Sequence, residues 1–174
     1  MSERVISRTV AESQAERSEI VFPNDTNPLG NLFGGRLMQF IDLVGAVAAV
    51  RHARTSCVTA SMDHLDFVSP VKIGELLILK ASVNRAFRTS MEVGVKAMVE
   101  DVLGSGRMRH IATAYLTYVA VDGLGGKVEV PQVIAETEHQ KRRHEDALAR
   151  REMRSSEVAR KKELRAKLSP EWHV

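Results

Sequence analysis

Residues 34–52 constrain the fold of this chain more than any other segment, because apolar side chains with helical spacing cover nearly every face of the stretch. Leu37, Ile41 and Val44 follow one helical stripe, and Phe40 lies on another face. A helix that is apolar almost all round is enclosed by protein. The segment therefore predicts a long central helix around which the rest of the chain packs.

A single carboxylate, Asp42, stands in the middle of this predicted helix. An ionised carboxylate is costly to bury unless it is paired or hydrogen-bonded, so Asp42 is either neutralised by a structural partner or held for chemistry. Gly34 and Gly35 open the helix, where free N–H groups and the positive end of the helix dipole favour negative charge. Gly35 and Asp42 share one helix face because seven residues separate them.

The segments flanking this helix carry strand patterns, and short polar turns separate the last three of them, which predicts an antiparallel meander. A sheet that curls around an apolar helix buries it on most sides. We therefore expect an α+β fold with a curved antiparallel sheet of about five strands, and its open edge predicts at least a dimer. The predicted strands span residues 18–22, 57–67, 75–86, 91–100 and 107–121.

The 174 residues suffice for one domain with its own core plus an appendage. We expect a loosely ordered N-terminus over residues 1–15, a domain over 16–126 and a mostly helical extension over 127–174. Since neither a secretory signal nor a membrane-spanning apolar run is visible, a cytoplasmic protein without membrane contact is expected. Because Cys57 is the single cysteine, an intramolecular disulfide is excluded. We expect Cys57 to be a buried thiol at the start of a strand.

The net charge of +3 comes from the C-terminal part of the chain. Residues 1–134 contain 14 Lys/Arg and 14 Asp/Glu, whereas residues 135–174 contain 11 and 8. The neutral body gives no reason to expect nucleic acid. Charged residues at i,i+4 spacing predict a C-terminal charged helix. Its basic clusters, 141–143 and 160–162, either bind phosphates or form a solvated face.

Common phosphate and metal motifs do not fit this chain. Gly30 and the Gly34–Gly35 pair have the look of a phosphate loop, but the Gly-Lys-Ser/Thr ending of a P-loop is missing. His139 and His144 are five residues apart and do not share a helix face, so we expect no metal.

Two segments resemble the signature of the hotdog-fold acyl-CoA thioesterases. Residues 25–35 read Asp-Thr-Asn-Pro-Leu-Gly-Asn-Leu-Phe-Gly-Gly, and residues 41–45 read Ile-Asp-Leu-Val-Gly. The chain most resembles the bacterial short hotdog thioesterases and the two hotdog domains of brain acyl-CoA hydrolase. The resemblance covers roughly residues 18–145 and leaves residues 146–174 outside. Further matches lie at 58–61, 66–67, 90–93, 117–119, 130–132 and 136–138.

The resemblance implies a hotdog fold, in which a long central helix is wrapped by the sheet and two protomers share a continuous sheet. It also implies that three such dimers often form a hexamer. The family's catalytic acid maps onto Asp42 and its asparagine onto Asn27, and in the family these residues meet across the dimer interface.

The activity implied by the resemblance is hydrolysis of acyl-CoA to CoA and a carboxylic acid. Asp42 acts as a general base or attacks directly to form an anhydride, and Asn27 orients the water or the carbonyl. The N–H groups near Gly34 and Gly35 stabilise the developing oxyanion. CoA is part of the substrate and the product, so no cofactor is expected.

Substrate contacts can be assigned on the same basis. Cationic and hydroxyl donors for the CoA phosphates are expected from a polar turn between two strands, and apolar side chains of the central helix are expected to line the acyl tunnel. These residues are Arg88, Thr89 and Ser90 for CoA, and Met38, Ile41 and Leu43 for the acyl chain.

Two alternatives use the same pocket. A protein that senses acyl-CoA or a nucleotide without hydrolysing it would use the basic tail as a partner surface. A hotdog dehydratase would need an active-site histidine, and the central helix offers only His52, at its far end.

Overall fold

The computed structural model describes residues 7–167, apart from the side chains of His64 and of residues 165–167. Its central element is helix α2 (Gly34–Ala53), which confirms the predicted long helix. The helix ends at Arg54, whose left-handed backbone (φ 58°) places its N–H on the carbonyl of Val50. Leu37, Phe40 and Ile41 on α2 are at most 2% exposed.

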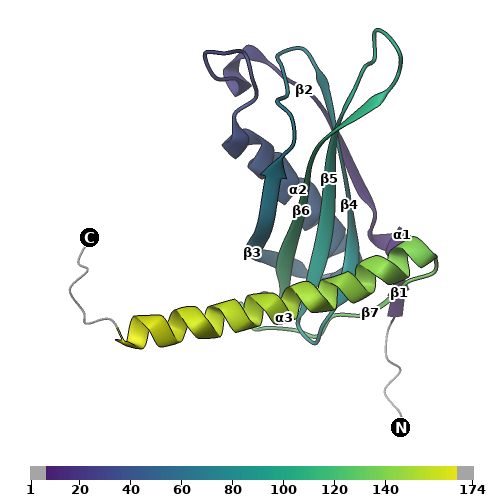
Figure 1. The fold of residues 1–174 in the computed structure, drawn as a ribbon. Helices are drawn as coiled ribbons and strands as arrows, with labels where there is room; N and C mark the ends of the chain where they lie inside the picture. Colours follow the sequence, from purple (N-terminus) through teal and green to yellow (C-terminus); the bar gives the residue numbers. More distant parts are fainter. Residues whose placement is uncertain (1–6, 168–174) are drawn as a thin grey trace.

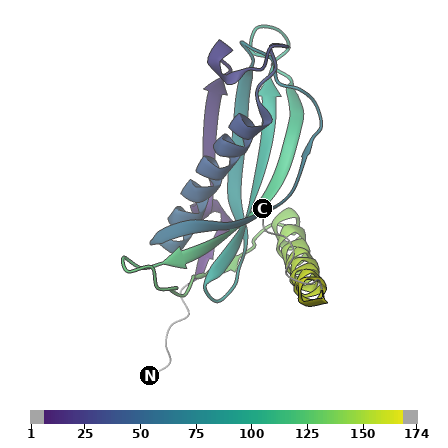
Figure 2. The same ribbon diagram turned by 90° about the vertical axis from the view of Figure 1, so that its left-hand side faces the viewer.

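A five-stranded antiparallel sheet curls around α2, as the patterning predicts. The strands are arranged in the order β2-β4-β5-β6-β3, so β4, β5 and β6 form the expected meander and β2 and β3 are the edges. Figure 2 shows α2 packed on one face of the sheet and the C-terminal helix on the other. The strand bounds are β2 (Ala15–Ile20), β3 (Ser56–Phe67), β4 (Leu76–Ala86), β5 (Ser90–Glu100) and β6 (Met108–Val121).

Alternation along the strands determines which side chains face α2. On β5, Met91, Val93 and Val95 are at most 1% exposed, and they belong to the core cluster that also contains the α2 side chains. Their neighbours Glu92 and Lys96 point to the opposite face, because successive strand residues alternate. The sheet therefore has an apolar inner face on α2 and a polar outer face.

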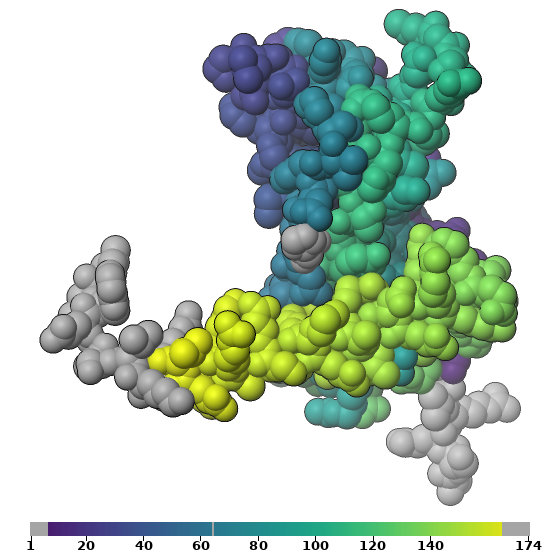
Figure 3. All heavy atoms as spheres, viewed as in Figure 1, coloured from purple at the N-terminus to yellow at the C-terminus, as the bar shows by residue number. Residues whose placement is uncertain are grey.

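Helix α3 (Glu138–Lys167) crosses the outer face at a steep angle to the strands (Figure 1). In the space-filling view it covers one end of that face and continues past the edge formed by β3 (Figure 3). Ala147, a residue of α3 itself, is fully buried against the sheet. The predicted C-terminal charged helix is therefore present, and its first half is packed on the sheet.

The N-terminal segment differs from the expectation. Strand β1 (Ser7–Thr9) pairs in parallel with β7 (Gln132–Ile134), and a capping box with Thr9 as N-cap starts the short helix α1 (Val10–Ser13). Ser13 is fully buried. The expectation of a loosely ordered segment is therefore wrong for residues 7–15, because β7, which the sequence reading missed, supplies the pairing partner; residues 1–6 lie outside the described part.

A second correction concerns the strand predicted over residues 18–22. Strand β2 runs over Ala15–Ile20, since Ala15 pairs with Ala81 and Ile20 with Leu76. The chain then turns through the short helix η1 (Pro23–Asp25). Among the helices that the structure describes, none is both long and apolar enough to cross a bilayer.

A single protomer leaves a broad face of α2 uncovered, with Leu43, Val47 and Val50 along one side of it and Met38 on the other. Met38 is 41% exposed, Leu43 45%, Val47 46% and Val50 42%. The neighbouring edge strand β3 also exposes apolar side chains, including Val58 and Phe67. An apolar face beside an open sheet edge is typical of a surface that a partner chain covers.

Candidate active site

Asp42 lies at the middle of α2, and its carboxylate accepts two hydrogen bonds from the sheet. Thr59 Oγ1 on β3 donates to Asp42 Oδ1 over 2.6 Å, and the Tyr118 hydroxyl on β6 donates to the same oxygen over 3.1 Å. Tyr118 also donates to the backbone carbonyl of Asp42 over 2.8 Å. Thr59 and Tyr118 are direct partners in the β3–β6 register, so the sheet itself sets their spacing.

The acid therefore has hydroxyl partners rather than a cation. No Lys, Arg or His lies within ion-pair distance of Asp42 in the part of the chain that the structure describes. Burial, reinforced by the neighbouring carboxylate, raises the pKa of Tyr118, so its hydroxyl stays protonated and acts as the donor. Asp42 itself is half-buried in one protomer, not enclosed as the apolar pattern around it suggested.

Helix α2 begins with two backbone N–H groups that no acceptor in residues 7–167 uses, those of Gly34 and Gly35. The first intrahelical bonds start later, from Arg36 and Leu37 to the Phe33 carbonyl. A Cβ at Gly35 would meet no atom within 4 Å, so the backbone is open to a ligand there. The helix start is therefore able to bind a negative charge.

The loop before α2 is held at the helix start by two contacts. Phe33 donates its N–H to the Asp25 carbonyl over 2.9 Å, and Arg36 forms an ion pair with the Asp25 carboxylate over 2.8 Å. Within this loop, Asn27 Oδ1 accepts from the N–H groups of Leu29 and Asn31. Asn27 therefore stabilises the turn with its oxygen and keeps its amide N–H₂ for another group.

The structure does not join Asn27 to Asp42 within one protomer: no hydrogen bond links them in residues 7–167. Along α2, the seven residues between Gly35 and Asp42 correspond to about 10 Å at a rise of about 1.5 Å per residue. One thioester carbon cannot contact both the helix start and Asp42 of the same helix.

The other predicted residues fall into separate places. Arg88 and Thr89 lie in the turn of the β4–β5 hairpin and Ser90 is the first residue of β5, at the end of the sheet where α2 finishes (Figure 1). Ser90 pairs with Val119, one register step from the pair that contains Tyr118, so this hairpin lies near the level of Asp42 rather than near Gly34. Arg88 is exposed.

The three predicted tunnel residues do not share a face. Ile41 is fully buried against the sheet, whereas Met38 and Leu43 are both exposed, on either side of Asp42 around the helix. A channel along the surface of α2 therefore meets Met38 and Leu43 directly, with Ile41 in the core behind them.

Comparison with known proteins identifies the family. Residues 29–104 match the model of the thioesterase superfamily. The chain is 40% identical over 144 residues to YkhA of Bacillus subtilis, a protein named as an uncharacterized acyl-CoA thioester hydrolase, with 83% of each chain covered. The chain belongs to the thioesterase superfamily. This confirms the family resemblance that the sequence motifs indicate.

Solved structures of this superfamily confirm the hotdog fold. An acyl-CoA hydrolase from Staphylococcus aureus, determined with butyryl-CoA, CoA and CoA disulfide, is 36% identical with a TM-score of 0.84 and covers 92% of this chain and 99% of its own. A hexameric acyl-CoA thioesterase in its apo form is 40% identical with a TM-score of 0.86, covering 89% and 99%. Other structures of the S. aureus hydrolase carry alanine in place of an aspartate, a threonine or an asparagine.

Sequence reasoning on this superfamily member missed Thr59 and Tyr118 as partners of Asp42. Both residues lie in segments that match the family signature, 58–61 and 117–119, but the resemblance gave them no role, and only the β3–β6 register shows that they meet at α2. His52 is fully buried, and its Nε2 contacts the Pro131 carbonyl at 2.8 Å, which leaves it no route to Asp42. Burial raises the pKa of Cys57 to about 11, so this thiol stays protonated at neutral pH.

Proposed function

We propose that this protein hydrolyses acyl-CoA thioesters to CoA and a carboxylic acid, with Asp42 as the reacting carboxylate. The observation that carries the proposal is the orientation of Asp42 by two hydroxyls on a helix whose first N–H groups are unused. The relatives and solved structures of similar sequence are named as acyl-CoA hydrolases, and one was determined with butyryl-CoA. The support thus comes from both the geometry and the family.

The site is complete only in a dimer. The uncovered face of α2 and the open edge of β3 provide one continuous surface for a second copy. Two α2 helices packed antiparallel bring the start of one close to the middle of the other, which removes the separation of about 10 Å along a single helix. Asn27 and Gly35 of one protomer then serve Asp42 of its partner. Three such dimers form the hexamer, an assembly named for one similar structure.

The reaction follows from these groups. The thioester carbonyl oxygen accepts from the N–H groups of Gly34 and Gly35, which stabilise the oxyanion as it forms. Asp42 either removes a proton from the attacking water or attacks the carbonyl carbon to form an anhydride that water then opens. The sulfur leaves as the thiolate of CoA. The free amide N–H₂ of Asn27 orients the water or the carbonyl.

Substrate binding uses the two ends of the same channel. The CoA phosphates bind to Arg88, Thr89 and Ser90 of the β4–β5 hairpin. This hairpin lies near the level of Asp42. The acyl chain runs between the paired α2 helices along Met38 and Leu43.

Release of CoA from butyryl-CoA, followed with a thiol reagent, tests the proposal. We expect Asp42→Ala and Asp42→Asn to lose at least about 10³-fold in kcat while keeping the dimer and the affinity for CoA. Arg88→Ala is expected to raise KM much more than it lowers kcat. Binding of butyryl-CoA without any release of thiol by the wild type would instead support the sensor alternative, and near wild-type turnover by Asp42→Ala would remove this residue from the chemistry.

A further inference from the structure

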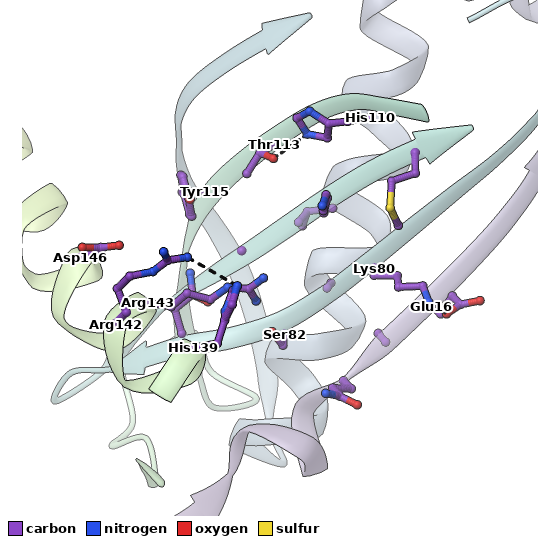
Figure 4. Close-up of a pocket in the computed structure, with 18 of the residues that line it drawn as sticks. Glu16, Lys80, Ser82, His110, Thr113, Tyr115, His139, Arg142, Arg143 and Asp146 are labelled. Atoms are coloured by element: carbon purple, nitrogen blue, oxygen red, sulfur yellow. Dashed lines mark hydrogen bonds and ion pairs between the residues drawn. The ribbon is translucent and has the colours of Figure 1, made fainter. Parts of the chain in front are cut away.

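A broad hollow lies on the outer face of the sheet, and Arg51 near the end of α2 also lines it. It is a groove of about 1060 Å³ between the first turns of α3 and strands β2, β4, β5 and β6 (Figure 4). Neither Asp42 nor any residue of the β4–β5 hairpin lines it. The sheet separates this groove from the proposed active site.

The floor of the groove brings two positive charges together. Lys80 on β4 and Lys96 on β5 are direct partners in the antiparallel register, and both are on the outer face. Like charges directly opposite each other on neighbouring strands are destabilising. Glu16 pairs with Lys80 over 3.2 Å, but Lys96 has no ion pair within residues 7–167. The charge of Lys96 is therefore left without a carboxylate partner in the described residues and is available to an anion.

Helix α3 adds two arginines and one carboxylate, that of Asp146, above this floor. Figure 4 shows His139, Arg142 and Arg143 projecting from α3 over the strands, on the same side of the sheet as Lys80. Arg142 contacts the ring of His139 at 3.5 Å, and Arg143 has no ion-pair partner among the described residues. These arginines belong to the basic cluster 141–143. From the sequence alone, this cluster either binds phosphates or forms a solvated face.

A buried acceptor at the groove is also unused. Asn84 lines the groove and is only 3% exposed. Its Nδ2 donates to Glu92 Oε1 over 2.9 Å, whereas its Oδ1 has no hydrogen-bond partner in the described part of the chain. A buried polar atom without a partner is costly, and a ligand with an N–H or O–H donor would satisfy it.

From these observations we propose that the groove is a second binding site, which holds a phosphorylated small molecule between Lys96 of the sheet and Arg143 of α3. Phosphate oxygens accept from the two cations and supply the counter-charge that Lys96 lacks among the described residues. A donor group of the same molecule contacts Asn84 Oδ1. The bound molecule bridges α3 and the sheet, and its binding does not require thioester hydrolysis.

Titration of the full-length protein with ADP at low salt, followed by isothermal calorimetry, tests this site. Lys96→Glu and Arg143→Glu each remove one cation, and we expect each to weaken ADP binding by about tenfold or more. Lys96→Glu also replaces a like-charge pair by an opposite-charge pair, so it does not endanger the fold. Arg160→Glu, with the same charge change further along α3 and outside the groove, is the matched control and is expected to bind as the wild type does.

Adenosine 3′,5′-bisphosphate, the nucleotide end of CoA, is titrated in parallel to identify the source of the phosphates. Tighter binding of ADP indicates a free nucleotide as the ligand, and tighter binding of the bisphosphate indicates CoA. Weaker binding of either compound by both Lys96→Glu and Arg143→Glu supports the site. The proposal is overturned if the wild type shows saturable binding of neither compound, or if Arg160→Glu weakens binding as much as Arg143→Glu. Butyryl-CoA hydrolysis by the same samples reports on the catalytic proposal separately.

Discussion

Arg150 on α3 forms two hydrogen bonds with the buried carboxylate of Glu92 on β5. Its Nε donates to Oε2 over 3.0 Å and its Nη2 to Oε1 over 2.7 Å, and the same guanidinium lies 3.7 Å from the ring centroid of Tyr115. The Glu92 side chain is only 2% exposed. Arg154 repeats the arrangement further along α3 with Asp63 on β3, at 2.6 and 2.9 Å. Helix α3 is therefore attached to the sheet mainly by charged groups.

Removing Arg150 should destabilise the protein strongly, because it leaves Glu92 buried without its partner. We expect Arg150→Ala to lower the free energy of unfolding by about 3 kcal/mol. Urea denaturation followed by circular dichroism measures the change. Arg160→Ala, on an exposed part of the same helix, is the control, and its effect should stay within about 0.5 kcal/mol. Equal stability of the two variants would show that the Glu92 pair does not hold α3.

Gly45 allows Tyr118 to reach Asp42, since a Cβ at this position would lie 2.6 Å from the Tyr118 hydroxyl and 3.3 Å from its ring. Gly45→Ala should therefore displace the tyrosine, lower the free energy of unfolding by about 1–3 kcal/mol and reduce turnover. Thermal denaturation and the thiol-release assay measure the two effects.

Two variants separate this clash from a general effect of adding a methyl group. Gly123→Ala adds a Cβ with no atom within 4 Å and should leave stability and turnover unchanged. Tyr118→Phe removes the clashing oxygen, so the Gly45→Ala and Tyr118→Phe double variant should be less destabilised than the sum of the single variants. Simple additivity would contradict the proposed contact.

Local patterns predict the elements of this fold well, because apolar periodicity depends on neighbours in the chain. The helix over residues 34–52 and the meander of β4, β5 and β6 follow from such patterns. Strand β7 does not, since three residues hold too little periodicity and its pairing with Ser7–Thr9 joins segments more than a hundred residues apart. The strand predicted over residues 18–22 was misplaced for a similar reason, because the bounds of β2 depend on its pairing with β4.

The candidate site was predictable only in part. The sequence identifies Asp42 because a carboxylate is rare in an apolar helix, and it identifies Gly34 and Gly35 because they open that helix. Thr59 and Tyr118 lie in segments that match the family signature, but their contact with Asp42 depends on the β3–β6 register, which the sequence does not give. The prediction that Asp42 is enclosed is wrong for one protomer. The apolar pattern of α2 includes a face that a single chain leaves exposed.

Thr59 should act as a positioning residue for Asp42. Thr59→Ala removes a hydrogen bond to a charged group, and we expect kcat for butyryl-CoA to fall by about 10- to 100-fold with KM nearly unchanged. Thr59→Ser keeps the hydroxyl and should retain activity within about threefold of the wild type. Steady-state thiol-release kinetics distinguish the two variants; an alanine variant with wild-type kcat would leave the 2.6 Å contact without a role in catalysis.

Acidification should weaken the protein through His52. Burial lowers the pKa of this side chain below its ordinary value of 6.5, and its contact with the Pro131 carbonyl only partly compensates. Between the lowered pKa and 6.5 the unfolded chain binds more protons than the folded chain, so the free energy of unfolding decreases as pH falls through this window. Above pH 6.5 the side chain is neutral in both states and this loss of stability is absent. The urea midpoint at pH 7.5, 6.5 and 5.5 measures this slope.

The slope can be assigned with two substitutions, because burial and the nearby Arg85 also lower the pKa of His144. His52→Gln keeps a side-chain donor for the Pro131 carbonyl but cannot titrate, so its urea midpoint should change less with pH than that of the wild type. His144→Gln, whose position on α3 is less buried, should flatten the slope to a smaller extent. A pH dependence in His52→Gln as steep as in the wild type would show that protons enter the unfolding equilibrium elsewhere.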